Sequence, residues 1–373
     1  MDNVSEQAYG GKRVIVVLGM HRGGTSVLAR GLQALGGNLG DSLIPPGSDN
    51  PKGFYEDAGF RLLNERLLRA LGHDWDTLAP ILPREMARPL TEEFARQAAA
   101  LVTARLSAAE VFAVKDPRMA RLLPFWQEIF ARLEVPVSYA IAVRNPLCVV
   151  ESLAQRRPIP REKAYFLWLE HMFASMELTA GQPRVVVAYD RLVQEPGPQL
   201  ERVARALHLH LDPQSPLIAE YQRDFIEPEL CHHNQRMEQL KADQAAPLAV
   251  ISFYQTLSQV AGDAFGIEDA RLTAALTAAG DLLANSFSAL RYLDETAGYL
   301  NHLTARTRAG GLAPHGYRAL RSFNANGDAL AAATEDACRA HGTAAWRMAA
   351  PMLRAGNSLR KALKARKARK SGR

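Results

Sequence analysis

The chain has 373 residues, of which 47% are hydrophobic and 23% are charged, and its formal net charge is +6 at pH 7. These values are typical of a globular protein with a substantial core, and no apolar run approaches a membrane span, so intrinsically disordered and membrane-spanning classes are excluded. Nine basic and no acidic residues lie in 354–373, which leaves −3 (6 minus 9) for the rest and gives no support for a nucleic-acid-binding body.

The number and spacing of the cysteines also limit the class of protein. Cys148, Cys231 and Cys338 are far apart and odd in number. Their spacing predicts neither a disulfide framework nor a metal site, and it suits a reducing compartment. The N-terminal residues lack the basic and then apolar pattern of a secretory signal. We therefore expect a cytoplasmic protein with no bound metal.

The first predicted element is a strand that leads through a glycine-rich loop into a helix. Residues 14–18 are apolar and mostly β-branched, which is typical of a strand buried on both faces. Residues 27–35 have helical spacing and end at two glycines. Between them lies a predicted anion cradle, because loop amides, hydroxyls and a helix N-terminus all favour negative charge. Its residues are Gly19, His21, Arg22, Gly23, Gly24, Thr25 and Ser26.

The residues of this loop limit which kind of ligand it can bind. Gly19 and Gly24 have the spacing of a nucleotide-binding P-loop, but Thr25 occupies the position of the lysine that contacts the β- and γ-phosphates. The cation of the loop is Arg22. A P-loop kinase or nucleoside triphosphatase is therefore an alternative that the missing lysine disfavours.

A turn-rich loop over residues 44–53 precedes a predicted helix over 61–71. Between them stand two adjacent carboxylates, Glu56 and Asp57. Glu56 is our first candidate for a general base, since a reacting hydroxyl needs a proton acceptor. The structural alternative is that Glu56 or Asp57 caps the helix that follows. A further helix is expected over 91–108.

Three more apolar runs, residues 111–114, 137–143 and 185–189, alternate with helical patterns. This alternation predicts an α/β fold with a central parallel sheet flanked by helices. Polar residues follow the second and third strands of the chain, where ligands of such sheets bind. They are Lys115, Asp116 and Arg144, and Ser152 lies on the next helix.

Arg144 and Ser152 are eight residues apart, a spacing that can bring both side chains to one phosphate. Together with the loop over residues 19–26, the pair resembles the nucleotide-binding motifs of the sulfotransferase family, in its bacterial branch. Further similarities are residues 115–118 and 144–146 and, less specific than these, residues 189–192. The resemblance covers about residues 10–235 and implies a P-loop-like fold.

The resemblance also implies a reaction. The donor would be 3′-phosphoadenosine-5′-phosphosulfate (PAPS), and the acceptor a hydroxyl or amine, by analogy a carbohydrate or a lipid-linked sugar. Arg22 would stabilise charge on the bridging oxygen, with Lys115 beside the transferred group. Thr25 and Ser26 would bind the 5′-phosphate, and Arg144 with Ser152 the 3′-phosphate.

The base and the activity itself stay open at this point. Asp116 is the second candidate for the base and His21 the third, whereas Asp116 could instead pair with Arg118 or Arg144. The catalytic set is therefore Arg22, Glu56, Lys115 and Asp116. A non-catalytic nucleotide-binding scaffold is the remaining alternative.

Beyond the predicted PAPS-binding domain, alanine and leucine dominate and β-branched runs disappear. We expect a helical extension over residues 236–350, with helices near 248–261, 270–299 and 327–341, and a basic tail over 351–373. The tail has two interpretations: a basic amphipathic helix that contacts the inner face of the membrane, or a solvated terminus.

Overall fold

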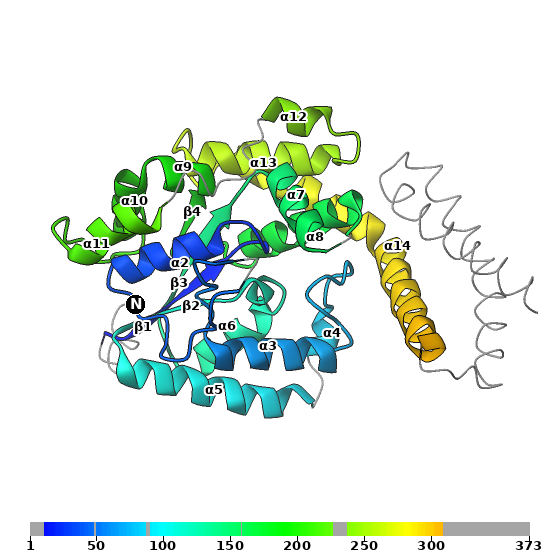
Figure 1. The fold of residues 1–373 in the computed structure, drawn as a ribbon, viewed down its shortest axis with the longest axis horizontal. Coiled ribbons are helices and arrows are strands. Elements are labelled where there is room, and N and C mark those ends of the chain that lie inside the picture. Colours follow the sequence, from blue (N-terminus) through cyan, green and yellow to red (C-terminus); the bar gives the residue numbers. More distant parts are fainter. Residues whose placement is uncertain (1–10, 48–49, 87–89, 158, 227–236, 309–373) are drawn as a thin grey trace, which may run out of the picture.

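Four largely apolar runs form a parallel sheet in the order β2-β1-β3-β4, as the computed structural model shows (Figure 1). The structure describes residues 11–47, 50–86, 90–157, 159–226 and 237–308. The strands are β1 (Arg13–Leu18), β2 (Val111–Lys115), β3 (Val137–Val143) and β4 (Arg184–Ala188). The predicted parallel α/β fold is confirmed, and each strand lies within two residues of its expected position.

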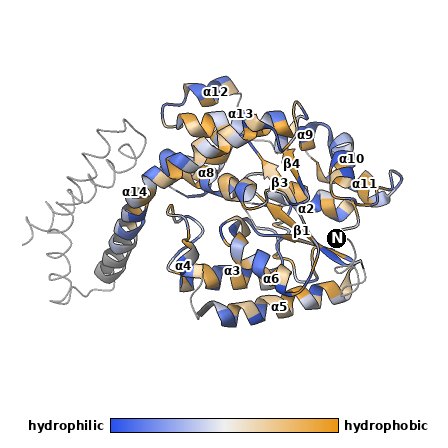
Figure 2. Cartoon of the chain, turned by 180° about the vertical axis from the view of Figure 1, so that it is seen from behind, coloured by the Kyte–Doolittle hydropathy of each residue, from blue (hydrophilic) through white to orange (hydrophobic). Residues whose placement is uncertain are grey.

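Helices connect the strands and cover both faces of the sheet (Figures 1 and 2). Up to the end of β4 they are α2 (Thr25–Ala34), α3 (Ala58–Ala70), α4 (Pro83–Met86), α5 (Leu90–Ala108), the 3₁₀ helix η1 (Pro117–Ala120), α6 (Leu123–Arg132), α7 (Pro146–Arg156) and α8 (Arg161–Glu177). After β4 come α9 (Tyr189–Gln194), α10 (Pro196–Ala206), α11 (Pro216–Glu220), the π-helix η2 (Tyr221–Phe225), α12 (Met237–Ala242), α13 (Leu248–Ala261) and α14 (Ala270–Arg308).

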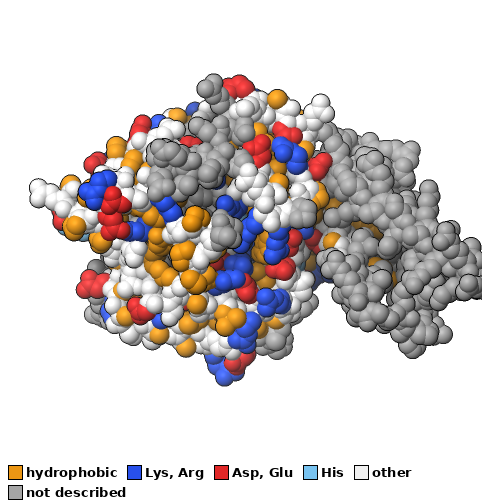
Figure 3. All heavy atoms as spheres, viewed as in Figure 1, with side chains coloured by type: hydrophobic (Ala, Val, Ile, Leu, Met, Phe, Trp, Pro, Cys, Tyr) orange, Lys and Arg blue, Asp and Glu red, His pale blue; other side chains and the backbone are white. Residues whose placement is uncertain are grey.

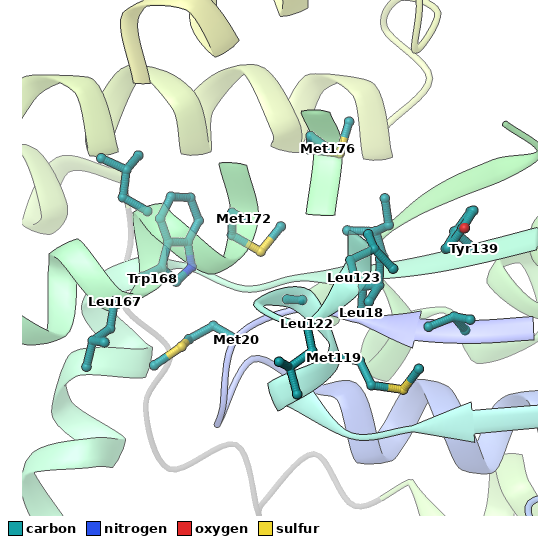
Figure 4. Packing of buried hydrophobic residues seen from close by; sticks show 14 of the residues in the cluster. Leu18, Met20, Met119, Leu122, Leu123, Tyr139, Leu167, Trp168, Met172 and Met176 are labelled. Carbon is teal, nitrogen blue, oxygen red and sulfur yellow. The ribbon is translucent and has the colours of Figure 1, made fainter. Parts of the chain in front are cut away.

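The period of the strands divides the core into two layers. Val14, Val16 and Leu18 of β1 belong to the cluster with α3, α5, α6 and α8, whereas Ile15 and Val17 face α2 and α10. Figure 4 shows part of the first layer, to which α8 contributes Trp168, Met172 and Met176, while Met20 and Met119 come from the segments after β1 and β2. Both faces of the sheet are therefore buried, and its carboxyl edge remains for a ligand.

The helices after residue 236 pack on this same core. Val250, Phe253 and Leu257 of α13 are buried in the first layer, and α14 contributes Leu283 and Leu290. The expected boundary at residue 235 stays a prediction. The expected helix over 327–341 and the basic tail lie outside the described residues. Over the residues that the structure covers, none of the helices combines the length and apolar character that crossing a membrane requires.

The buried Arg121 connects the loop after α3 to the core through hydrogen bonds. Arg121 donates through Nε to Glu170 Oε1 at 3.2 Å, and through its Nη atoms to the carbonyls of Asp74 and Ala79 at 2.7 and 2.8 Å. Its side chain has no exposed surface. Because each nitrogen of this guanidinium has a partner, the loop is anchored without an unsatisfied donor.

The variant Arg121→Met leaves the Glu170 carboxylate and two carbonyls without their donor. We expect the free energy of unfolding to fall by about 3–5 kcal/mol, because an uncompensated buried charge remains. Urea denaturation measures this. Arg132→Met is the control, since that side chain is 47% exposed and its solvent-screened pairs with Glu92 and Glu128 should contribute little to stability. Equal losses in the two variants would contradict the assignment.

Candidate functional site

The loop between β1 and α2 has the backbone of an anion cradle. Arg22 and Gly24 both adopt left-handed conformations, at φ 64° and 89°. A Cβ at Gly24 would lie 2.5 Å from the ring of Tyr189, so only glycine fits there. Arg22 holds the same backbone region at a cost of about 1–3 kcal/mol, a strain that is typical of binding loops. The backbone of the loop thus holds Arg22 in a fixed position at a cost in folding stability.

The N-terminus of α2 is open to an anion. Its N-cap is Gly24, which has no side chain to bond the first-turn amides. Thr25 is buried in the first turn, and Ser26 donates from Oγ to the carbonyl of Phe54 at 3.1 Å. Uncapped amides at the start of a ten-residue helix favour a phosphate or sulfate.

Three residues of the predicted donor site come together beside this loop. Arg22 Nε donates to Ser152 Oγ at 2.8 Å, and Arg144 Nη1 donates to the carbonyl of Arg22 at 3.2 Å. The neighbouring strands β1 and β3 end side by side, which places the loop next to Arg144. The guanidinium of Arg144 lies 4.3 Å from the centroid of the Tyr189 ring. Residues that are 130 positions apart therefore share one site.

Lys115 and Glu56 form the second part of the site. Lys115 Nζ lies 2.7 Å from Glu56 Oε1, 3.0 Å from the carbonyl of Phe54 and 3.3 Å from Ser26 Oγ. Both charged side chains are at least 90% buried. Arg118 Nη1 lies 3.8 Å from the other carboxylate oxygen of Glu56. This arrangement fixes the Glu56 carboxylate next to the helix N-terminus, between two cations.

The two remaining carboxylates of the sequence analysis have structural partners. Asp57 is the N-cap of α3: it accepts from the amides of Gly59 and Phe60 and pairs with Arg105 at 2.7 Å. The capping alternative therefore applies to Asp57, and Glu56 does not cap α3.

Asp116 lies outside the cavity lining, with no exposed surface. It accepts from Asn64 and from Arg118, whose Nη1 is at 3.0 Å. Adjacent residues of an extended chain point in opposite directions, so Asp116 turns away from the cavity that Lys115 faces. Asp116 is therefore not positioned to accept a proton from a ligand in the cavity.

His21 directly precedes Arg22 in the loop. Its ring centroid is 4.7 Å from that of Trp75 and 6.0 Å from that of His171, and its Nε2 is buried with no hydrogen-bond partner among the described residues. Burial, and after it the charge of Arg118, holds the pKa of His21 well below the usual 6.5. The imidazole is therefore neutral at pH 7.

The lowered pKa predicts a pH dependence of stability. Since the unfolded chain binds the extra proton, the contribution of neutral His21 is present above pH 6.5 and is lost as the pH falls below it. We expect a slope of up to about 1.4 kcal/mol per pH unit from this residue between pH 6.5 and 5. Urea titrations at pH 7.5, 6.5 and 5.5 should show a smaller slope for His21→Gln. The exposed His208, changed to Gln, is the control, and an unaltered slope in His21→Gln would contradict the prediction.

A cavity of about 290 Å³ joins these parts at the carboxyl edge of the sheet. Of the predicted site residues, it is lined by His21, Arg22, Gly24, Thr25, Ser26, Glu56, Lys115 and Arg144. Ser152 does not line the cavity itself, but it accepts a hydrogen bond from Arg22, which does. Gly19 and Gly23 belong to the loop and do not line the cavity either. Figure 3 shows Lys and Arg side chains gathered near the middle of one face of the molecule.

The apolar end of this cavity was not predicted from the sequence. Tyr189, Val193, Phe225 and Ile226 line it from α9 and from the segment around η2. The ring of Phe225 stacks on Tyr221 and meets the edge of Tyr55, with centroids 5.7 and 5.6 Å apart. Tyr189 had been expected to end the fourth strand, and instead it begins α9. No local pattern marked Phe225.

Across the described ranges, the structure contains no group of three or more His, Cys, Asp and Glu side chains that could hold a metal ion. Cys231 and Cys338 lie outside those ranges, and Cys148 is buried and forms no disulfide within the part of the chain that the structure describes. The donors around the cavity are amides, hydroxyls and cations. Such a set suits an anionic ligand.

The fold and site thus define a parallel α/β protein with a glycine-rich loop whose amides, hydroxyls and cations suit an anion. No protein-family model matches the chain, and no curated protein matches it. Among solved structures it is similar to the sulfotransferase domain of the Synechococcus PCC 7002 olefin synthase, at 18% identity over 73% of this chain and 95% of that one, with a TM-score of 0.37. It is also similar to the sulfotransferase domain of the curacin biosynthetic pathway, at 16% identity over 73% and 98%, with a TM-score of 0.36.

Proposed function

We propose that the protein transfers a sulfuryl group from PAPS to a hydroxyl or amine of an acceptor. The observation that carries this proposal is the convergence of Arg22, Arg144 and Ser152, with an Nε–Oγ distance of 2.8 Å, beside an uncapped helix N-terminus. A site that bound only a nucleoside triphosphate would need a cation next to the helix start in place of Thr25. The proposal therefore rests on the contacts of this chain's own residues.

The cavity suits the donor at both of its ends. The amides of the loop and the hydroxyls of Thr25 and Ser26 would hold the 5′-phosphate, and Arg144 with Ser152 would hold the 3′-phosphate. The rings of Tyr189 and Phe225 offer an apolar wall of the kind that a purine base stacks on. When bound, PAPS supplies an activated sulfuryl group with a phosphate leaving group.

Arg22 and Lys115 would act on the charge that develops during transfer. Negative charge grows on the oxygen that bridges phosphorus and sulfur as that bond breaks, and a fixed guanidinium stabilises it more in the transition state than in the ground state. Arg22 stays protonated at neutral pH, so its role is electrostatic and not that of a proton donor. Lys115, held by Glu56 and the Phe54 carbonyl, would bind the oxygens of the transferred group.

Glu56 is the carboxylate positioned to take the proton of the acceptor hydroxyl. It lines the cavity, and it does not cap α3. Lys115 and Arg118 fix the orientation of its two oxygens. In the proposed reaction, Glu56 takes the proton from the acceptor hydroxyl as the oxygen attacks sulfur. The third candidate from the sequence, His21, lies in the same cavity and is neutral.

The test is turnover of PAPS by the full chain with a panel of phenols, sugars and amines. We expect adenosine 3′,5′-bisphosphate to form in proportion to a sulfated product, which chromatography with mass detection follows. Donor binding without turnover on any acceptor would favour a nucleotide-binding scaffold. Tight binding of ATP with magnesium, and ATP hydrolysis, would favour a nucleoside triphosphatase.

A further inference from the structure

The loop over residues 50–55 meets the apolar end of the cavity at Phe225. Lys52 and Phe54 of this loop line the cavity, and Phe225 and Ile226 line it from the segment around η2. Lys52 and Phe225 are 173 positions apart in the chain and are in direct contact. This contact therefore lies in the wall of the proposed donor site, and the reaction described above gives Lys52 no part.

Lys52 contacts both the backbone and the ring of Phe225. Its Nζ donates a hydrogen bond to the carbonyl of Phe225, and the same ammonium lies over the ring, 5.1 Å from the centroid. A cation over the face of an aromatic ring is attracted by the negative charge of that face. Both contacts therefore favour the position of the ammonium at the ring.

The other neighbours of the Phe225 ring are held more firmly. Tyr221 stacks on it with centroids 5.7 Å apart, has no exposed surface, and donates from its hydroxyl to a backbone carbonyl of α2 at 3.1 Å. Arg30, 5.9 Å from the centroid, is buried and pairs with a carboxylate of α11 at 2.7 Å. Tyr55 meets the edge of the ring. Lys52 is partly exposed and belongs to a loop, so it is the neighbour that can leave the ring most easily.

A purine base that stacks on Phe225 needs a face of that ring. Because Tyr221 is stacked on the ring and Lys52 lies over it, the base gains this face when the ammonium moves away. The four-carbon stem of a lysine is flexible, and Lys52 lines the same cavity as the loop of Arg22. A phosphate bound there gives the ammonium a charge-assisted hydrogen bond in place of the neutral carbonyl. A ligand without a phosphate offers no such replacement.

We propose that Lys52 makes the site selective for phosphorylated nucleotides over nucleosides. With a nucleoside, the ammonium stays at Phe225 and competes with the base for the ring. With a nucleotide, the ammonium moves to a phosphate and leaves the ring to the base. This inference rests on the proposed function for the nucleotide as ligand, and on the contacts of Lys52 for the selectivity. Lys52 is then a specificity residue, because it acts on donor binding and not on the reacting atoms.

Calorimetry on the full chain with adenosine and with adenosine 3′,5′-bisphosphate tests this inference. The variant Lys52→Met keeps an unbranched side chain and removes the charge. We expect it to bind adenosine about three- to tenfold more tightly, because the base no longer competes with a cation. It should bind the bisphosphate about three- to tenfold more weakly, because one charge-assisted contact is lost. Lys241→Met, which changes an exposed lysine of α12, is the matched control and should alter neither affinity.

A second measurement follows the ammonium itself. Reductive methylation with ¹³C keeps the charge of lysine, and a methyl group over an aromatic ring resonates upfield of one in solvent. We expect the signal that is missing in Lys52→Met to lie upfield of the signals of exposed lysines. It should lose this shift in Phe225→Leu and on addition of the bisphosphate, and keep it with adenosine.

Each outcome decides the inference. A Lys52→Met protein that binds adenosine no more tightly, adenosine that binds neither protein, or a methyl signal that the bisphosphate leaves in place would overturn the selectivity while the proposed function stands. Failure of the bisphosphate to bind would overturn the proposed function, and the selectivity with it. The Phe225→Leu spectrum then still shows whether Lys52 covers this ring.

Discussion

Replacing Arg22 by alanine should lower the turnover of PAPS about 10²–10³-fold and weaken the binding of adenosine 3′,5′-bisphosphate less than tenfold. The larger loss falls on turnover because the guanidinium opposes charge that exists only in the transition state. The backbone is not the cause, since alanine has the same Cβ as arginine at φ 64°. Steady-state kinetics and calorimetry on the same preparation separate the two effects.

Arg22→Lys is the matched control for charge. A lysine keeps a point charge in the loop but loses the Nε contact to Ser152, so turnover should fall less than in the alanine variant. If Arg22→Ala turned over within tenfold of the unaltered protein, Arg22 would have no part in the chemistry. Equal losses in the alanine and lysine variants would point to the hydrogen bond with Ser152 rather than to charge.

Replacing Glu56 by glutamine should lower turnover about 10²–10⁴-fold for a hydroxyl acceptor, because the proton then has no acceptor at that position. The affinity for adenosine 3′,5′-bisphosphate should stay within about threefold. An amide oxygen still accepts from Lys115, so the variant removes the base while it keeps the contact at 2.7 Å.

Glu65→Gln is the control for this variant, because Glu65 also contacts Arg118, at 3.0 Å, and does not line the cavity. It should keep turnover within about threefold. A Glu56→Gln protein with full turnover would exclude Glu56 as the base and make His21 the next candidate. Equal losses in the two glutamine variants would indicate that the orientation of Arg118 matters, and not proton transfer.

The sheet and its polar edge were predictable from local pattern. Apolar runs such as residues 14–18 of β1 are buried on both faces, so their continuous apolar sequence predicts a strand of a parallel sheet. Parallel strands bring their carboxyl ends to one edge, which makes Lys115 and Arg144 neighbours of the loop after β1. The contact between Arg22 and Ser152 follows from the same topology, because α7, which carries Ser152, begins directly after β3.

What sequence reasoning missed depends on packing between distant segments. Phe225 reaches the cavity through α11 and η2, two short helices that no periodic pattern announces, and its place is fixed by Tyr221 and Tyr55. Asp116 looked equivalent to Lys115 because the two are adjacent, but the pleat of the extended chain turns them to opposite sides. Adjacent carboxylates differ for a similar reason: Asp57 bonds the amides of α3, whereas Glu56 faces Lys115.

The central claim is that Arg144 and Ser152 bind the ribose phosphate of a nucleotide whose 5′ end lies on the loop of Arg22. Calorimetric titration of adenosine 3′,5′-bisphosphate against adenosine 5′-monophosphate tests it most directly. We predict that the bisphosphate binds about 10–100-fold more tightly, and that Arg144→Ala and Ser152→Ala each reduce this advantage without changing the affinity for the monophosphate. Equal affinity for the two nucleotides, or an advantage that both variants retain, would contradict it.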